Sequence, residues 1–153
     1  MAADYWTGTW THIEGTFTEG TFTEGAGTSG AGYRQYLGAR TSGDVTADDP
    51  RMAGTMTQVQ NVHFATSPEP DEGDVGITNG TARIDNEAGA WVGTWTAFGA
   101  QPGGEEWYIL EGEGSYEGLT TVFRYHGEDS SLEGVILAAE LPALPDPVAP
   151  PTE

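Results

Sequence analysis

Charged and amide side chains recur within the segments whose alternating pattern is typical of strands. Glu, Arg, His and Gln side chains are the groups that move protons or stabilise a charge that develops during a reaction. If such strands surround a substrate, we expect most of the catalysis to come from folding that substrate into a reactive shape, with one carboxylate, phenol or amide stabilising the developing charge. Glu111 and Arg83 are the catalytic candidates among these groups, and Gln58 is a candidate for ligand binding. The remaining polar candidates on strands are Gln60, Glu105, Arg124 and His126.

The elements that must position these groups are about eight strands, identified by period-2 alternation between Gly, Pro, Asn and Asp clusters. Because alternate residues of a strand face opposite sides, either face of each strand could point inward, and the alternative for each polar candidate is solvated surface. In the first strand, residues 5–13, one face carries Trp6, Gly8, Trp10 and His12. Further strands are predicted at 33–41, 54–65, 75–84, 90–98, 105–111, 120–126 and 132–140.

This series of similar strands, without helical periodicity, predicts one all-β domain. The expected fold is a closed antiparallel up-and-down β-barrel of about eight strands, because closure removes every exposed strand edge. An open sandwich is the alternative. The domain is assigned to residues 1–140, and the Pro-rich residues 141–153 are assigned to a C-terminal tail, since proline cannot donate ladder hydrogen bonds. Residues 15–24 are two copies of Gly-Thr-Phe-Thr-Glu, interpreted as a local duplication within a strand or hairpin.

The composition argues against several classes of function. The formal net charge is −19, lysine is absent and the five basic residues are all arginine, so the summed field would repel nucleic acid and anionic membranes. The absence of cysteine excludes disulfides, a thiolate nucleophile and Cys-ligated metals. The N-terminal residues do not have a signal-peptide pattern, which predicts a soluble protein, either cytoplasmic or secreted with a leader removed. A homo-oligomer remains open.

No pattern of cofactor or metal ligands is found. The acidic segment 69–74 lacks the spacing of a calcium loop. The three histidines, His12, His63 and His126, fall on different strands without paired spacing, so no metal site is predicted. A phosphate loop, a dinucleotide fingerprint and a Gly-x-Ser-x-Gly elbow are also absent, and no cofactor is predicted.

A motif in the last third of the chain resembles that of a known barrel superfamily. Residues 112–120 read Gly-x-Gly-x-Tyr-x-Gly-Leu-Thr and lead into the strand at 122–125. This pattern is similar to the turn and strand of allene oxide cyclases, plant dirigent proteins and bacterial spirotetronate cyclases. The resemblance implies a calycin-like or allene oxide cyclase-like barrel and a cofactor-independent isomerase or cyclase acting on a terpenoid, polyketide or oxylipin-type substrate. It also implies that Tyr125 lines the pocket and is a catalytic candidate, with Phe123 as its same-face neighbour.

A second resemblance concerns the first strand, where Trp6-Thr7-Gly8-Thr9-Trp10 is similar to the opening strand of lipocalins and avidins. Those barrels enclose an apolar ligand without converting it. The resemblance therefore keeps a non-catalytic carrier as an alternative, beside a structural accessory domain whose interior is filled.

Aromatic residues on the predicted strands are candidates to hold a hydrophobic small molecule, because flat faces can line a cavity. The alternative is that these rings fill the interior of an eight-stranded barrel. The ligand-binding set consists of Trp10, Trp95, Trp107, Phe123, Tyr125 and Gln58.

Overall fold

The structure is a computed structural model that describes residues 3–26, 32–66, 75–100 and 104–139. The described residues form nine antiparallel strands. A helix with the length and apolar composition of a membrane span is absent from them. The strands are β1 (Ala3–His12), β2 (Thr21–Ala26), β3 (Gly32–Ala47), β4 (Gly54–Thr66), β5 (Val75–Asp85), β6 (Gly89–Ala100), β7 (Glu105–Gly114), β8 (Thr120–His126) and β9 (Ser131–Leu137).

The strands form one sheet that returns to itself as a ring. From β3 to β9 each strand pairs with the next along the chain, and β1 pairs with β9 on one side. β1 also pairs with the second half of β3, from Gly8 opposite Ala47 to His12 opposite Gly43. The all-β prediction and its antiparallel meander are therefore confirmed, and the open sandwich is wrong because β1 joins both ends of the series.

Two differences from the predicted strands concern β3. The prediction ended this strand at Thr41, whereas β3 continues to Ala47 and its second half makes the contact with β1 that completes the ring. The register shifts between Leu37 and Ala39, where Gly38 has a φ of 72°. The duplicated segment also contacts β3: Thr18 bridges Arg40, and the second copy contributes to β2.

Other predictions fall on residues that the structure does not describe. The Pro-rich tail at 141–153 and the acidic segment at 69–74 lie outside the described residues.

One end of the ring is closed by the turns that join its strands. Trp91 stacks on Tyr116 with ring centroids 5.0 Å apart, and its Nε1 donates to the carbonyl of Arg51 at 2.8 Å. The Tyr116 hydroxyl donates to Asn86 Oδ1 at 2.8 Å, and Asn86 Nδ2 donates in turn to the carbonyls of Arg51 and Ala53. These bonds satisfy the polar atoms of three turns beneath the buried core, so this end is sealed.

Halfway along the axis of the ring, four aromatic side chains cross the interior from β6 to β1. We call them the aromatic row. Register places Trp95 opposite Tyr108, and Tyr108 opposite Phe123. Gly134 of β9 pairs with Phe123 on one side and with Trp6 on the other. Because Gly134 has no side chain, Phe123 and Trp6 meet edge to face across β9 with centroids 5.2 Å apart. The aromatic row consists of Trp6, Phe123, Tyr108 and Trp95.

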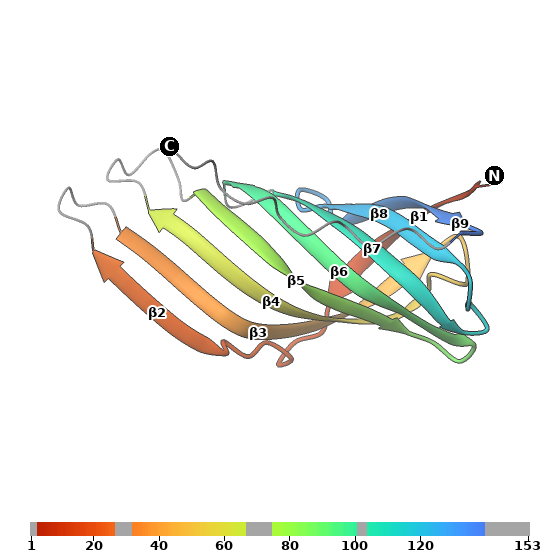
Figure 1. The fold of residues 1–153 in the computed structure, drawn as a ribbon, viewed down its shortest axis with the longest axis horizontal. Helices are drawn as coiled ribbons and strands as arrows, with labels where there is room; N and C mark the ends of the chain where they lie inside the picture. Colours follow the sequence, from red (N-terminus) through yellow and green to blue (C-terminus); the bar gives the residue numbers. More distant parts are fainter. Residues whose placement is uncertain (1–2, 27–31, 67–74, 101–103, 140–153) are drawn as a thin grey trace, which may run out of the picture.

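Beyond His12, where β1 ends, the sheet is no longer complete around its circumference. Figure 1 shows β2, β3, β4 and β5 extending to the left past β1, β8 and β9. The longest strands of this part are β3 and β4, with 16 and 13 residues, against 7 residues in each of β8 and β9. The interior is therefore packed at the sealed end and has room for a cavity at the other end.

Replacing Gly134 by alanine tests the close packing of the aromatic row. A Cβ at this position would lie 2.4 Å from Phe123 Cβ and 2.6 Å from the Val122 carbonyl oxygen. Because the backbone must shift to relieve these contacts, we expect Gly134→Ala to lower the free energy of unfolding by about 1–3 kcal/mol in urea denaturation. Gly104→Ala is the matched control, since its Cβ would meet its nearest atom at an ordinary 3.5 Å. Equal stability of the two variants would contradict the close approach of β8 to Gly134.

Candidate functional site

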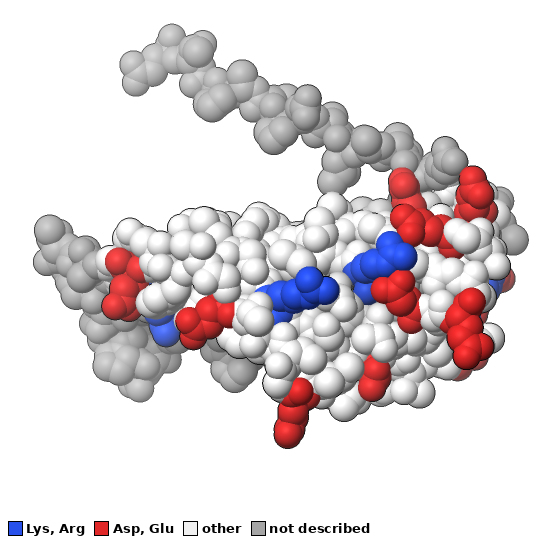
Figure 2. Space-filling view, turned by 90° about the horizontal axis from the view of Figure 1, so that it is seen from below, with Lys and Arg blue, Asp and Glu red and all other residues white. Residues whose placement is uncertain are grey.

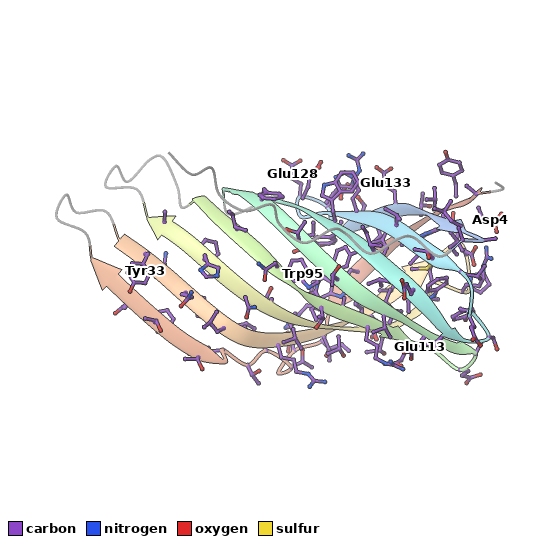
Figure 3. The ribbon with its side chains drawn as sticks, in the orientation of Figure 1. Asp4, Tyr33, Trp95, Glu113, Glu128 and Glu133 are labelled. Atoms are coloured by element: carbon purple, nitrogen blue, oxygen red, sulfur yellow. The ribbon has the colours of Figure 1, made fainter. Side chains whose placement is uncertain are left out.

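A cavity of about 420 Å³ lies on the inner face of the sheet, above the aromatic row. Its walls come from β1, β3, β4, β5, β6, β7 and β8, and Trp95 and Tyr108 contribute from the row itself. Phe17 and Phe98 also line the cavity, and each is at least half exposed, so the cavity reaches solvent at this end. Figure 3 shows Trp95 midway along the sheet, far from Glu113 near the sealed end. The principal lining side chains are Trp10, Tyr36, Met56, Gln58, Gln60, Phe64, Thr78, Trp95, Ala97, Glu106, Tyr108 and Tyr125.

A carboxylate, a phenol and an amide meet on the wall of this cavity. The Tyr108 hydroxyl donates a short hydrogen bond to Glu106 Oε2. Gln58 Nε2 donates to the same Oε2 at 3.3 Å and makes a short hydrogen bond to the Tyr108 hydroxyl oxygen. Glu106 and Tyr108 are two residues apart on β7 and so share its inner face, while Gln58 reaches them from β4 across the interior. We call these three residues the polar triad.

Burial changes the acidity of both titratable members of the polar triad. Loss of solvent around Glu106 raises the pKa of its carboxyl group, and this effect outweighs the hydrogen bonds from Tyr108 and Gln58, which lower it. Burial also raises the pKa of Tyr108 well above its usual value, and the neighbouring charge of Glu106 adds to that shift. The phenol therefore stays protonated as the donor, and the raised pKa means that the Glu106 carboxyl group keeps its proton to a higher pH than an exposed one would.

Aromatic faces surround the triad. Trp95 stacks on Tyr108 with centroids 5.6 Å apart, and Tyr108 stacks on Phe123 at 4.5 Å. On the β8 side of Glu106, Tyr125 meets Trp10 of β1 edge to face with ring centroids 5.9 Å apart. The indole N–H groups of Trp95 and Trp10 are buried and have no hydrogen-bond partner among the described residues. A Cβ added to Gly80 would lie 2.9 Å from Trp95 Nε1, so this N–H lies against backbone.

Four of the eight residues predicted from the sequence lie together at the cavity. Trp10, Trp95, Tyr125 and Gln58 all contribute to its lining. Tyr125 is opposite Glu106 in the register of β8 and β7, and its hydroxyl lies 3.4 Å from Ser130 Oγ. Phe123 faces inward as predicted, but it is 1% exposed within the aromatic row and does not line the cavity.

The other three predicted residues lie on the outer surface, and the expectation that they contact an enclosed molecule is wrong. Arg83 forms ion pairs with Asp85 at 2.8 Å and Glu113 at 2.9 Å. Glu111 is exposed on the outer face of β7. Trp107 is 46% exposed on the same face, beneath the Arg124 guanidinium. The physical reason is strand alternation: even-numbered residues of β5 and β7 face inward, so these odd-numbered ones face out.

Arginine side chains of the outer surface are accompanied by acidic ones. On the face shown in Figure 2, blue arginines lie beside red carboxylates. Arg124 contacts Glu133 through a close ion pair, and Arg51 bridges Asp49 at 2.6 Å and Asp4 at 2.8 Å. No arginine is among the described residues that line the cavity, and Glu106 is the only carboxylate there.

Glu106 was not selected from the sequence. It stands between Glu105 and Trp107 in a segment where both parities carry aromatic and acidic residues, so alternation alone does not distinguish the faces. The register of β7 with β6 does: Tyr108 opposite Trp95 places two large rings on the inner face and brings Glu106 with them. Pairing the aromatic positions of neighbouring strands would have identified it.

No family model matches the chain, and no curated protein or solved structure is significantly similar to it.

The raised pKa of Glu106 predicts a pH-dependent effect on stability. The folded state binds the Glu106 proton more tightly than the unfolded state, so this contribution is fully present below the unfolded pKa and is lost as pH rises through the folded pKa. We therefore expect Glu106→Gln to gain stability relative to the wild type as pH rises from about 5 to about 8. Urea denaturation at several pH values measures this difference. Glu111→Gln, which removes an exposed charge from the same strand, is the control. Parallel curves for the two variants would contradict the assignment.

Proposed function

We propose that this protein binds a hydrophobic small molecule in the cavity above the aromatic row and holds the polar end of that molecule at the polar triad. The observation that carries the proposal is the combination of a solvent-connected cavity of about 420 Å³ with one hydrogen-bonded carboxylate on an aromatic wall. Small-molecule sites are typically concave, largely apolar and furnished with a few convergent polar groups. The cavity matches that description in size and in chemistry.

The arrangement of the strands supports the same function. A closed up-and-down barrel of the calycin or allene oxide cyclase-like kind has one ligand-sized interior, and the ring made by β1 with β3 and β9 is consistent with it. A wholly filled interior, as in the structural accessory domain, is disfavoured because the packed core beneath the aromatic row leaves the cavity above it open. The carrier and the isomerase share the binding step, so that step is tested first.

Filling the cavity should abolish binding. Ala97 lines the cavity and is half-buried on β6, so Ala97→Phe would occupy the space that an apolar ligand needs. We expect Nile red, a neutral dye whose emission rises in apolar surroundings, to bind the wild type and to bind Ala97→Phe at least about tenfold more weakly, which corresponds to about 1.4 kcal/mol. Dye titration followed by fluorescence measures both dissociation constants.

The matched control is Thr94→Phe, which places the same ring on the exposed outer face of the same strand. It should bind Nile red as the wild type does. Native mass spectrometry of the purified wild type adds a second readout, because a retained small molecule should be absent from Ala97→Phe. Equal dye binding by the two phenylalanine variants would place the dye outside the cavity and overturn the proposal.

Catalysis is a second candidate function, and the raised pKa of Glu106 favours it. A carboxylate with a raised pKa can take a proton from a bound carbon acid and return it to another atom of the same molecule. The Tyr108 hydroxyl donates to this carboxylate and stabilises it when it is ionised. This is a cofactor-independent isomerisation in which the protein ends unchanged. Tyr125 faces the same space and can orient the substrate.

The catalytic candidate is tested by asking whether a retained ligand is converted. The compound to test is the one that the wild type retains and that Ala97→Phe does not. It should rearrange on incubation with the wild type and with Glu111→Gln. With Glu106→Gln its rate of conversion should fall by about 10²-fold or more, the usual effect of removing a general base. Chromatography coupled to mass spectrometry follows the isomer. Release of the compound unchanged from the wild type would assign the protein to the carriers.

A further inference from the structure

The polar triad presents hydrogen-bond acceptors to the cavity, because its donors are already used. The Tyr108 hydroxyl proton and the Gln58 amide N–H groups are directed at Glu106 Oε2 and at the phenol oxygen. Glu106 Oε1 and Gln58 Oε1 accept no hydrogen bond from the described residues. Gln58 cannot be turned end for end without setting its carbonyl oxygen against a carboxylate, so this assignment of donor and acceptor follows from the network.

The charge around these acceptors has one sign. Tyr125 on β8 faces Glu106, Gln58 approaches from β4, Trp95 and Ala97 line β6, and none of them carries a positive charge. Arg124 and His126 of β8 are directed to the outer surface, where both contact Glu133 and Glu105. Arg34 has the same strand parity as Tyr36 and lies one step farther towards the projecting end of β3. The described residues that line the cavity therefore include no cation beside Glu106.

Aromatic faces complete the environment that a cation prefers. Trp95 and Tyr108 lie on one side of the carboxylate, and Tyr125, which pairs with Glu106 from β8, lies with Trp10 on the other side. A cation over an indole or phenol ring is attracted by the negative face of the ring, most strongly where water is excluded. A carboxylate among aromatic rings should bind an ammonium group more tightly than a hydroxyl group or a second carboxylate.

From these contacts we infer that the ligand of this cavity is an amine, whose protonated nitrogen donates to Glu106 Oε1 and Gln58 Oε1 while its apolar body lies against Trp95 and Tyr125. The inference rests on the proposed binding function and specifies the ligand class. It differs from the apolar, neutral or acidic ligands that the sequence resemblances imply, because none of those ligands supplies a positive charge for Glu106.

Three naphthalene probes with the same ring and different polar ends test the inference. They are 2-(2-naphthyl)ethylammonium, 2-(2-naphthyl)ethanol and 2-naphthylacetate, each titrated by calorimetry near pH 8, where an alkylammonium is still largely charged. We expect the ammonium to bind about tenfold to a hundredfold more tightly than the alcohol, the range given by one charge-assisted hydrogen bond, and the carboxylate to bind most weakly.

Two variants locate the effect. Glu106→Gln should remove the preference for the ammonium and leave the affinity for the alcohol within about threefold, since the apolar contacts remain. Glu111→Gln makes the same charge change on the outer face of β7 and should keep the preference. A preference that survives in Glu106→Gln would arise from the net charge of the chain and overturn the inference.

The pH dependence gives an independent readout. As pH falls through the raised pKa of Glu106, its carboxyl group becomes neutral, so the ammonium should lose affinity while the alcohol does not. Binding of the alcohol as tightly as the ammonium at pH 8 would overturn the inference and leave the proposed function standing. Failure of all three probes to bind, in a sample that also fails to bind Nile red, would overturn both.

Discussion

The register that sets Trp95, Tyr108 and Phe123 side by side is the constraint on which the rest of the structure depends. Three rings in consecutive strands fill the interior from β6 to β8, and Gly134 lets Phe123 reach Trp6 beyond β9. On the other side, Trp95 is opposite Gly80, which has no side chain to extend the row. The row is thus complete on one half of the ring and open on the other. It forms both the roof of the sealed core and the floor of the cavity.

The placement of Glu106 follows from the same register and has a cost in stability. A strand that contributes Tyr108 to the row must point its inner neighbours, Glu106 and Leu110, to the same side. Leu110 enters the sealed core, where it is fully buried, whereas Glu106 falls at the cavity, where desolvation raises its pKa. An apolar residue at position 106 would avoid that penalty. Groups that oppose folding in this way are typical of functional sites rather than of structural cores.

Much of the fold could be predicted from the sequence because local signals carry it. Turn clusters separate the strands, and the alternation in β1 placed Trp6 and Trp10 together on one face, which points inward in the structure. The end of β3 was missed because Ser42-Gly43-Asp44 has the composition of a turn, although the backbone there pairs with β1. That contact is made between residues more than thirty positions apart along the chain, and nothing in a local pattern encodes it.

The site was only partly predictable for a related reason. Trp10, Trp95 and Gln58 were selected as aromatic or polar residues on predicted strands, and Tyr125 because the resemblance implies a position in the pocket; all four line the cavity. In β7 each face has an aromatic ring and an acidic residue, so composition does not show whether Glu106 or Glu111 faces the interior. Only the pairing with β6 and β8 separates them. An isolated strand does not determine its inner face, whereas two neighbours with fixed rings do.

The net charge of the chain adds a long-range attraction for cations to the short-range effect of Glu106. Arg51, Arg83 and Arg124 each pair with carboxylates outside the ring and so neutralise surface charge, while the described residues that line the cavity include Glu106 and no arginine. Surface pairs are screened by salt, whereas a partly buried carboxylate such as Glu106 is screened much less. The long-range field of a chain with net charge −19 raises the local concentration of any cation near the cavity mouth, and Glu106 then acts at short range. Salt should therefore weaken the long-range attraction more than the preference for a charged over a neutral ligand, because only the second depends on contact with Glu106.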